Sequence, residues 1–315
     1  MTTTVTKTVM ASGGDYTSLS AWEAAQQGDL VAADEIRQAE CHAFSDTTAV
    51  DIDGWTTDAT HYIRVYAAQN HGGVYDVTSY RLEPNDTNWT LLCREEYARI
   101  EGLLLTNLAT VLRVAYTFAA SATSDQRWER CIIKGTANIT NGMQWDNATT
   151  GRMVNCLVYD LTASSATAFY ILVSSVVGLL NCTAINCKTG FSPQTVTILK
   201  NCAYYSQGLA SANGYSGAVD AASTNNASDL ASDSPGANPH DSVVPTFVNE
   251  ANDDFHLSQM DQAWKGQGAD LSATFTEDID REDRRALWDI GADQAVFQPY
   301  RAPLPVQLAE VFGLC

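Results

Sequence analysis

The sequence predicts an all-β fold, a single-stranded right-handed parallel β-helix, and three observations lead to it. A short phrase with cysteine at its second position recurs four times between residues 98 and 206, and self-similarity at a period of about 20–50 residues indicates a repeat architecture. Each phrase is rich in Ile, Val, Leu, Thr and Tyr and is too short for a helix pair. Clusters of Gly, Asn, Thr and Ser separate the phrases and read as turns.

The cysteines of the four phrases are predicted to form a ladder inside the solenoid. They step by 25, 26 and 20 residues along the chain: Cys131, Cys156, Cys182 and Cys202. Stacked coils lie about 4.8 Å apart, so equivalent residues lie over one another and a small side chain can stack in the core. An earlier segment fits the same register with Gly102 at the cysteine position. An ordinary β-sandwich with chance cysteine spacing is the alternative.

Four regions are expected along the chain. Residues 1–35 form an N-terminal arm and a short helix, in which Trp22 is predicted to cover the open end of the first coil. Residues 36–207 form the β-helix. Residues 208–240, rich in Ala, Ser, Asn, Gly and Asp, read as a loop or linker. Residues 241–315 form a closing segment and a tail.

The charge balance argues against several partners. The chain has 18 basic and 37 acidic residues and a net charge of −19, which disfavours binding to nucleic acid or to an anionic membrane surface. Its first residues carry neither a basic region nor an apolar run, so we expect no signal peptide and synthesis in a host cytoplasm. The eight cysteines are then expected to be reduced, and the absence of a CxxC pair argues against zinc.

Two stretches resemble a known superfamily. Gly14 to Ala24 is similar to the N-terminal cap of many right-handed parallel β-helix proteins of the pectate-lyase-like superfamily. The more specific match is the ending, from Asp254-Phe255-His256-Leu257 through Asp278-Ile279-Asp280 and Arg285 to Asp289-Ile290-Gly291-Ala292-Asp293. It resembles the closing segment of bacterial and phage β-helix proteins, with Arg281 in place of the usual Gly and without the usual Ser-Pro-Ala stretch.

The resemblance leaves the function open, because the superfamily includes lyases, hydrolases, adhesins and virion spikes. We expect a virion structural protein, a spike or fibre on the tail or head of a phage or phage-like particle that attaches to host-surface glycan. Its expected partners are surface polysaccharide and other virion proteins. The alternative is a polysaccharide lyase or glycoside hydrolase, and an exported adhesin is a third option. No stack of carboxylates follows the cysteine ladder, so attachment is favoured over catalysis.

Aromatic residues are the main clue to a binding face. Planes with neighbouring carboxylates and amides suit carbohydrate, and the candidates are Trp145, Tyr159, Tyr204 and Tyr205. The alternative is that these rings are core stacks. Asp146 and Asp160 are the one candidate pair for glycoside hydrolysis, with two surface turn residues as the alternative.

No cofactor is expected, and the acidic cluster near the C-terminus is a weak candidate for a metal site. Asp278, Asp280 and Glu282 have a spacing that suits calcium. The glycine that a tight calcium loop needs is absent, and neighbouring arginines neutralise the cluster. A surface loop held by salt bridges is the favoured interpretation.

A homotrimer is expected because phage β-helix spikes resemble one another in forming parallel trimers. Ile132 and Leu157 follow the ladder cysteines and should point outward, and an outward apolar patch usually marks an interface. The Pro-rich tail ends in apolar residues that include Phe312, which we expect to pack against a neighbouring subunit.

Overall fold

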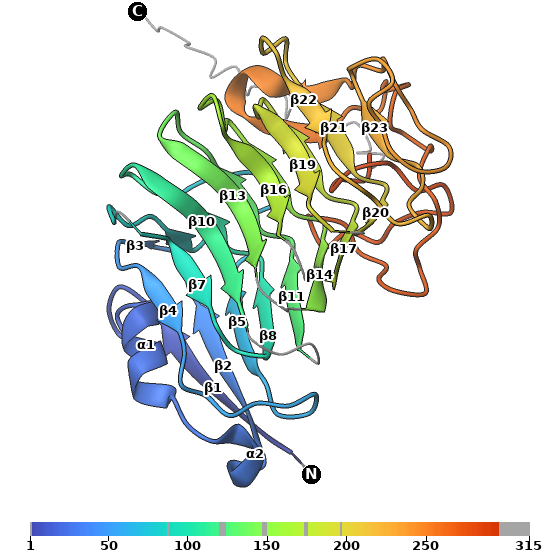
Figure 1. Cartoon of the computed structure of the whole chain (residues 1–315). Helices are drawn as coiled ribbons and strands as arrows, with labels where there is room; N and C mark the ends of the chain where they lie inside the picture. The colour runs from blue at the N-terminus through green and yellow to red at the C-terminus, as the bar shows by residue number, and fades with distance from the viewer. Residues whose placement is uncertain are drawn as a thin grey trace, which may run out of the picture.

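A computed structural model of the chain describes residues 2–86, 88–119, 124–146, 150–172, 176–195 and 197–295. Most of its regular structure is β-strand, gathered in three long parallel sheets that run along the molecule (Figure 1). A full coil adds one strand to each sheet in turn, so hydrogen-bonded neighbours lie one coil apart in the sequence. The fold is therefore the parallel β-helix that the sequence predicts.

The three sheets contain eight, eight and seven strands among the described residues. The first sheet comprises β1 (Thr3–Val9), β2 (Glu35–Cys41), β5 (Ile63–Ala67), β8 (Tyr97–Glu101), β11 (Asp125–Glu129), β14 (Thr150–Val154), β17 (Val176–Leu180) and β20 (Ile198–Lys200). The second comprises β3 (Ser45–Asp46), β6 (Arg81–Leu82), β9 (Leu104–Leu105), β12 (Ile132–Lys134), β15 (Leu157–Tyr159), β18 (Thr183–Ile185), β21 (Ala203–Tyr205) and β23 (Ala227–Ser228). The third comprises β4 (Val50–Ile52), β7 (Leu91–Cys93), β10 (Val111–Phe118), β13 (Ile139–Asp146), β16 (Thr167–Ile171), β19 (Thr189–Pro193) and β22 (Asn213–Tyr215).

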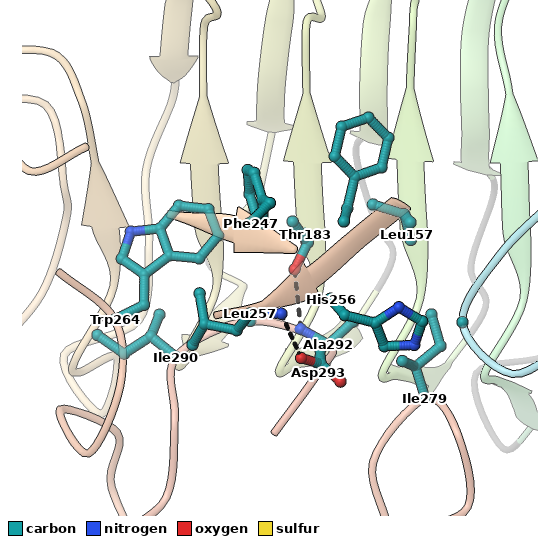
Figure 2. A pocket seen from close by; sticks show the side chains of 13 residues that line it. Leu157, Thr183, Phe247, His256, Leu257, Trp264, Ile279, Ile290, Ala292 and Asp293 are labelled. Carbon is teal, nitrogen blue, oxygen red and sulfur yellow. Dashed lines mark hydrogen bonds between the residues drawn. The ribbon is translucent and has the colours of Figure 1, made fainter. Parts of the chain in front are cut away.

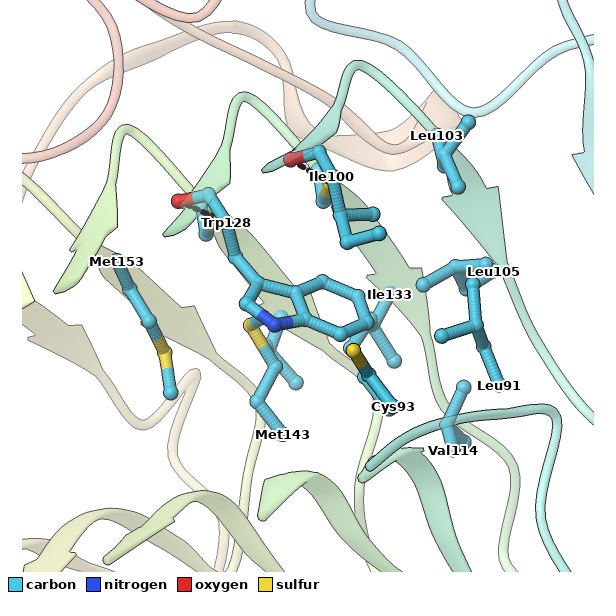
Figure 3. Packing of buried hydrophobic residues seen from close by; sticks show 14 of the residues in the cluster. Leu91, Cys93, Ile100, Leu103, Leu105, Val114, Trp128, Ile133, Met143 and Met153 are labelled. Carbon is cyan, nitrogen blue, oxygen red and sulfur yellow. Dashed lines mark hydrogen bonds between the residues drawn. The ribbon is translucent and has the colours of Figure 1, made fainter. Parts of the chain in front are cut away.

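Side chains from all three sheets meet in one elongated core. Trp128 of the first sheet lies beside Ile133 of the second sheet and Met143 of the third sheet (Figure 3). The ladder cysteines, Cys131, Cys156, Cys182 and Cys202, are fully buried at equivalent turns between the first and second sheets. All seven cysteines among the described residues are buried and unpaired. Burial raises the pKa of the Cys156 thiol well above its usual value, which keeps it protonated and unreactive.

The residue before each ladder cysteine has a left-handed backbone conformation. Arg130, Asn155, Asn181 and Asn201 have φ between 51° and 55°. Gly102 also has a positive φ of 66°, and the pairing of Glu101 with Glu129 places it opposite Arg130. The sequence-based alignment, which placed Gly102 at the cysteine position, was therefore wrong by one residue. Leu103 occupies that position. A single left-handed residue turns the chain sharply, and Gly and Asn adopt that conformation at the least steric cost.

The N-terminal region closes one end of the solenoid. β1 pairs in parallel with β2 and extends the first sheet, and the helices α1 (Leu19–Gln26) and α2 (Leu30–Ala33) follow it. Trp22, on α1, is fully buried and stacks on Trp55 with ring centroids 5.5 Å apart. Neither helix, nor any other in the described part of the chain, is long and apolar enough to cross a membrane.

The stretch from 208 to 240, expected to be a linker, continues the solenoid. It carries β22 and β23, and further parallel bridges join Thr224 to Ala237 and Ala227 to His240. The closing segment then begins with the antiparallel pair β24 (Phe247–Asn249) and β25 (Asp254–Leu257), which flank a short 3-10 helix, η1 (Glu250–Asn252). Its ribbon, orange to red, lies beside the last coils (Figure 1).

Candidate functional site

The outer surface of the third sheet is the first candidate site. One row along it comprises Leu92, Tyr116, Gln144 and Tyr170, which pair from coil to coil, whereas the adjacent rows enter the core. Phe118, 36% exposed, pairs with Asp146 in a second outer row. We call this surface the third-sheet face and define it by Trp89, Arg94, Arg113, Tyr116, Phe118, Asn141, Gln144, Asp146 and Tyr170.

Polar contacts hold the side chains of the third-sheet face in place. The Tyr116 hydroxyl donates to Asp146 Oδ2 at 3.0 Å, and the Arg113 guanidinium lies over the Tyr116 ring, 4.3 Å from its centroid. Gln144 Oε1 accepts from Arg113 Nε at 3.0 Å and from Asn141 Nδ2 at 2.8 Å. Tyr116, Asn141 and Gln144 are only 8%, 6% and 3% exposed. The accessible part of the face is therefore formed by Phe118 and by partly exposed aromatic, arginine and carboxylate side chains, a combination suited to sugar rings and their hydroxyl groups: Trp89, Arg94, Arg113, Asp146 and Tyr170.

A cavity of about 390 Å³ adjoins one end of the third-sheet face. Its lining comprises Asp53, Gly54, Trp55, Thr56, Thr57, Arg94, Glu95 and Glu96. The capping helix helps to build it, because Glu23 of α1 accepts hydrogen bonds from the Trp55 indole at 3.2 Å and from the Asp53 amide at 3.3 Å. Arg94 belongs to both the cavity and the third-sheet face.

Two carboxyl groups of this cavity differ in environment. Glu95 is only 6% exposed and accepts one hydrogen bond from the Trp55 backbone amide at 2.8 Å. Burial raises the pKa of Glu95 to about 7. The Asp53 side chain is 65% exposed and lies 4.0 Å from Arg94 Nε. A carboxyl that holds its proton near neutral pH beside a solvated carboxylate is the pairing that acid–base chemistry on a sugar needs.

The closing segment covers the outer surface of the second sheet. Phe255, Ile279 and Ala292 pack on a row that includes Leu104, Ile132 and Leu157. Figure 2 shows three of these side chains, Leu157, Ile279 and Ala292. Ile132 and Leu157 therefore point out of the solenoid as expected, but they are 0% and 4% exposed. The patch assigned to a neighbouring subunit is instead buried by the chain's own C-terminal residues. The other expected contact, Phe312, lies outside the described residues.

The asparagine side chains at the left-handed turns between the first and second sheets hold the closing segment in place. Asn181 Nδ2 donates to the carbonyls of Asp289 at 3.0 Å and of Gly291 at 2.9 Å. Asn201 donates to Ala269 O at 2.9 Å and accepts from Ala269 N at 2.8 Å. The buried Arg284 donates to Asn155 Oδ1 at 2.8 Å. The arginine that anchors the closing segment is thus Arg284, whereas the resemblance assigned that place to Arg285, which is exposed.

His256 lies at the centre of an acidic cluster in the closing segment. Its Nδ1 faces Asp254 Oδ1, and its Nε2 lies 2.8 Å from Asp280 Oδ2. Burial alone would lower the pKa of His256, but the hydrogen bond and the charge of Asp280, with Asp293 nearby, raise it to about 10. Asp293 Oδ2 accepts from Leu257 N at 2.6 Å (Figure 2), and burial raises the pKa of Asp293 to about 7.

The acidic residues expected to bind metal are divided between two roles. Asp278 is fully buried, and its Oδ1 accepts from the amides of Asp280 at 2.9 Å and Glu282 at 3.0 Å. It therefore shapes the backbone turn, and its carboxylate is directed at amides. Asp280 belongs instead to the His256 cluster, and Glu282 lines the cavity beside that cluster. The expected set does not converge on one point.

The structure does not bring the expected aromatic residues together on a surface. Trp145 and Tyr204 are fully buried in the main core. Tyr159, 1% exposed, packs against Phe255, and Tyr205 packs against Phe247 at 6.0 Å. These rings are core and closing-segment contacts, which excludes stacking of a sugar on the three buried ones.

The expected acidic pair is also separated. Asp146 ends β13, whereas Asp160 follows β15 and lies against Gly135, just ahead of β13. They lie at opposite ends of the third sheet, roughly 20 Å apart at about 3.3 Å per strand residue. Two carboxylates that cooperate on a glycosidic bond lie roughly 5–9.5 Å apart.

Comparison with known proteins adds no name to this geometry. No family model, curated protein or solved structure matches the chain. The parallel β-helix is thus shown by the strand pairing, and the pectate-lyase-like assignment stays a prediction.

Proposed function

We propose that this chain is a glycan-binding attachment protein, a spike or fibre of a phage or phage-like particle. The observation that carries the proposal is the third-sheet face, where the exposed Phe118 and the partly exposed Tyr170 lie on outer rows whose neighbouring polar side chains are hydrogen-bonded. Attachment to a long surface polysaccharide suits this arrangement, because the face extends over several coils and its backbone is held by the ladder of a rigid solenoid.

Two further points support the proposal. Phe118 is 36% exposed, so the face presents an aromatic side chain that the chain does not bury. The donors and acceptors around it are already oriented by mutual hydrogen bonds, which reduces the entropy lost when a ligand binds. The placement on a virion rests on the resemblance of the cap and the closing segment to phage β-helix proteins.

Isothermal titration with host-surface polysaccharide tests the binding proposal. Phe118→Ala and Tyr170→Ala should each weaken binding at least ~10-fold, since an aromatic anchor removed from a contact costs on the order of 2 kcal/mol. Tyr66→Ala, on the first sheet, is the matched control and should bind as the parent does. Equal affinity of all three variants would remove the third-sheet face from the proposal. Labelled antibody and electron microscopy of particles test the virion location.

Glycoside hydrolysis is the second candidate function, and the Glu95 cavity favours it. In this reaction Glu95 donates its proton to the glycosidic oxygen as the bond to the anomeric carbon breaks. Water adds to that carbon and gives its proton to Asp53, so the products are a new reducing end and an alcohol. The cavity adjoins the third-sheet face through Arg94, so a bound chain would reach it.

Release of reducing ends from the same polysaccharide decides between attachment alone and attachment with cleavage. Cleavage predicts new reducing ends with the parent and a loss of at least ~100-fold with Glu95→Gln, the usual range for removal of an acid–base group. Glu96→Gln, a neighbour in the same cavity, is the matched control and should stay active. No reducing ends with a polysaccharide that binds would limit the function to attachment.

A further inference from the structure

The His256 cluster contains three ligand groups from three separate parts of the closing segment. His256 lies on β25, Asp280 on the turn after Ile279, and Asp293 near the end of the described chain. One ligand atom from each lies within 4.8 Å of the others. Tetrahedral bonds of about 2.0–2.2 Å to imidazole nitrogen and carboxylate oxygen place ligand atoms roughly 3.5 Å apart, so the three side chains would move inward to hold an ion.

The surroundings of His256 match those of a metal-bound imidazole. Asp254 Oδ1 faces Nδ1, which leaves Nε2 directed at Asp280 and Asp293. A carboxylate on the far nitrogen is the usual outer partner of a metal-ligating histidine, because it fixes the ring and its tautomer. Asp254 thus has the position of an orienting group. Nε2, which is hydrogen-bonded to Asp280 in the metal-free chain, has the position of a ligand and would release its proton when the ion binds.

Asp280 provides the independent sign of a missing partner. Its side chain is 12% exposed, and its Oδ1 atom is buried without a hydrogen-bond partner. The backbone of Gly73 packs against this oxygen and against His256 Nε2, and a Cβ on Gly73 would come within 2.5 Å of both. A buried carboxylate oxygen without a donor is costly, and coordination to a cation removes that cost.

The other side of the cluster opens to a cavity of about 650 Å³, lined by Asp254, His256, Asp280, Glu282 and Asp293 among others. We propose that His256 Nε2, Asp280 and Asp293 bind one divalent transition-metal ion of the zinc type, with Asp254 as the orienting group. A site with three protein ligands leaves a fourth position for water, which would face the cavity. The ion would tie together three stretches of the closing segment over the second sheet.

Titration of the chelator-treated full chain with Co²⁺ and Zn²⁺ tests this site directly. We expect saturable binding of one ion, visible absorption bands of bound Co²⁺ that Zn²⁺ removes, and a higher melting temperature in the presence of Zn²⁺. The absence of saturable one-to-one binding by the parent protein would overturn the proposal, whatever the variants do.

Two variants assign the ligands. Asp293→Asn keeps an oxygen toward the Leu257 amide, so it should fold, and it should weaken binding more than Asp254→Asn does. A change to the orienting group costs ~10–100-fold in metal affinity. Glu282→Gln, in the same cavity, and His61→Gln, where a partly buried histidine lies between Asp34 and Asp58, are matched controls that should bind normally. Unchanged affinity in Asp293→Asn would also overturn the proposal.

Discussion

At the scale of single residues, Trp22 closes the N-terminal end of the solenoid. Its ring is fully buried and stacks on Trp55, whose amide and indole hold the Glu95 and Glu23 carboxylates. Trp22→Ala should therefore lower the free energy of unfolding by ~3–5 kcal/mol. Urea denaturation measures the loss, and Trp22→Phe, which keeps a ring in the site, should lose much less. Equal stability of all three proteins would contradict the capping role.

Glu95 gives stability a pH dependence that can be measured apart from any activity. Its pKa rises from 4.5 to about 7 on folding, so the folded chain binds its proton more tightly than the unfolded chain does. The stability that this proton provides is complete below pH 4.5 and is lost as pH rises toward 7. Glu95→Gln avoids the loss and should be ~3 kcal/mol more stable than the parent at pH 8.

The same comparison at pH 4 provides the control for Glu95. Both proteins then have a neutral side chain at this position, and their melting temperatures should nearly coincide. A Glu95→Gln variant that gains nothing between pH 4 and pH 8 would show that the carboxyl is not held in its neutral form.

At the scale of elements, the asparagine turns connect the solenoid to its cover. Asn181 combines a left-handed backbone with two hydrogen bonds to the closing segment. Asn181→Gly keeps the backbone and loses the bonds, whereas Asn181→Ala loses both. We expect Asn181→Ala to be less stable than Asn181→Gly by ~1–2 kcal/mol, the cost of a left-handed conformation with a Cβ. Thermal denaturation of the pair separates the two roles, and equal stability would contradict the turn geometry.

The sequence was sufficient to predict the repeated coils but not the way in which the closing segment covers the second sheet. Cysteine spacing locates the coils because it is periodic, and Cys156 lies where its period places it. The sequence did not show that the closing segment covers Ile132. An outward apolar residue gives the same sequence signal whether a partner subunit or the chain's own C-terminal part covers it. Tyr116 and Phe118 were missed as candidates, although their alternation with Thr117 in an apolar strand is a signal for an outer row.

At the scale of the whole molecule, oligomerisation remains a prediction. The closing segment covers the row that includes Ile132 and Leu157, so contacts between subunits would have to come from other surfaces or from the tail after 295. Light scattering of the full chain should give three times 34.1 kDa, and a chain truncated after Phe297 should give a monomer. A monomeric full chain, or a trimer that survives truncation, would contradict the expected role of the tail.

The central claim is that glycan lies along the third-sheet face, and hydroxyl-radical footprinting of the bound complex tests it most directly. Saturating polysaccharide should suppress oxidation of Trp89, Phe118 and Tyr170, because a bound sugar chain excludes solvent from these rings. Met260, 77% exposed in the closing segment, is the internal reference and should stay reactive. Undiminished oxidation of the three rings while glycan is bound would contradict the account.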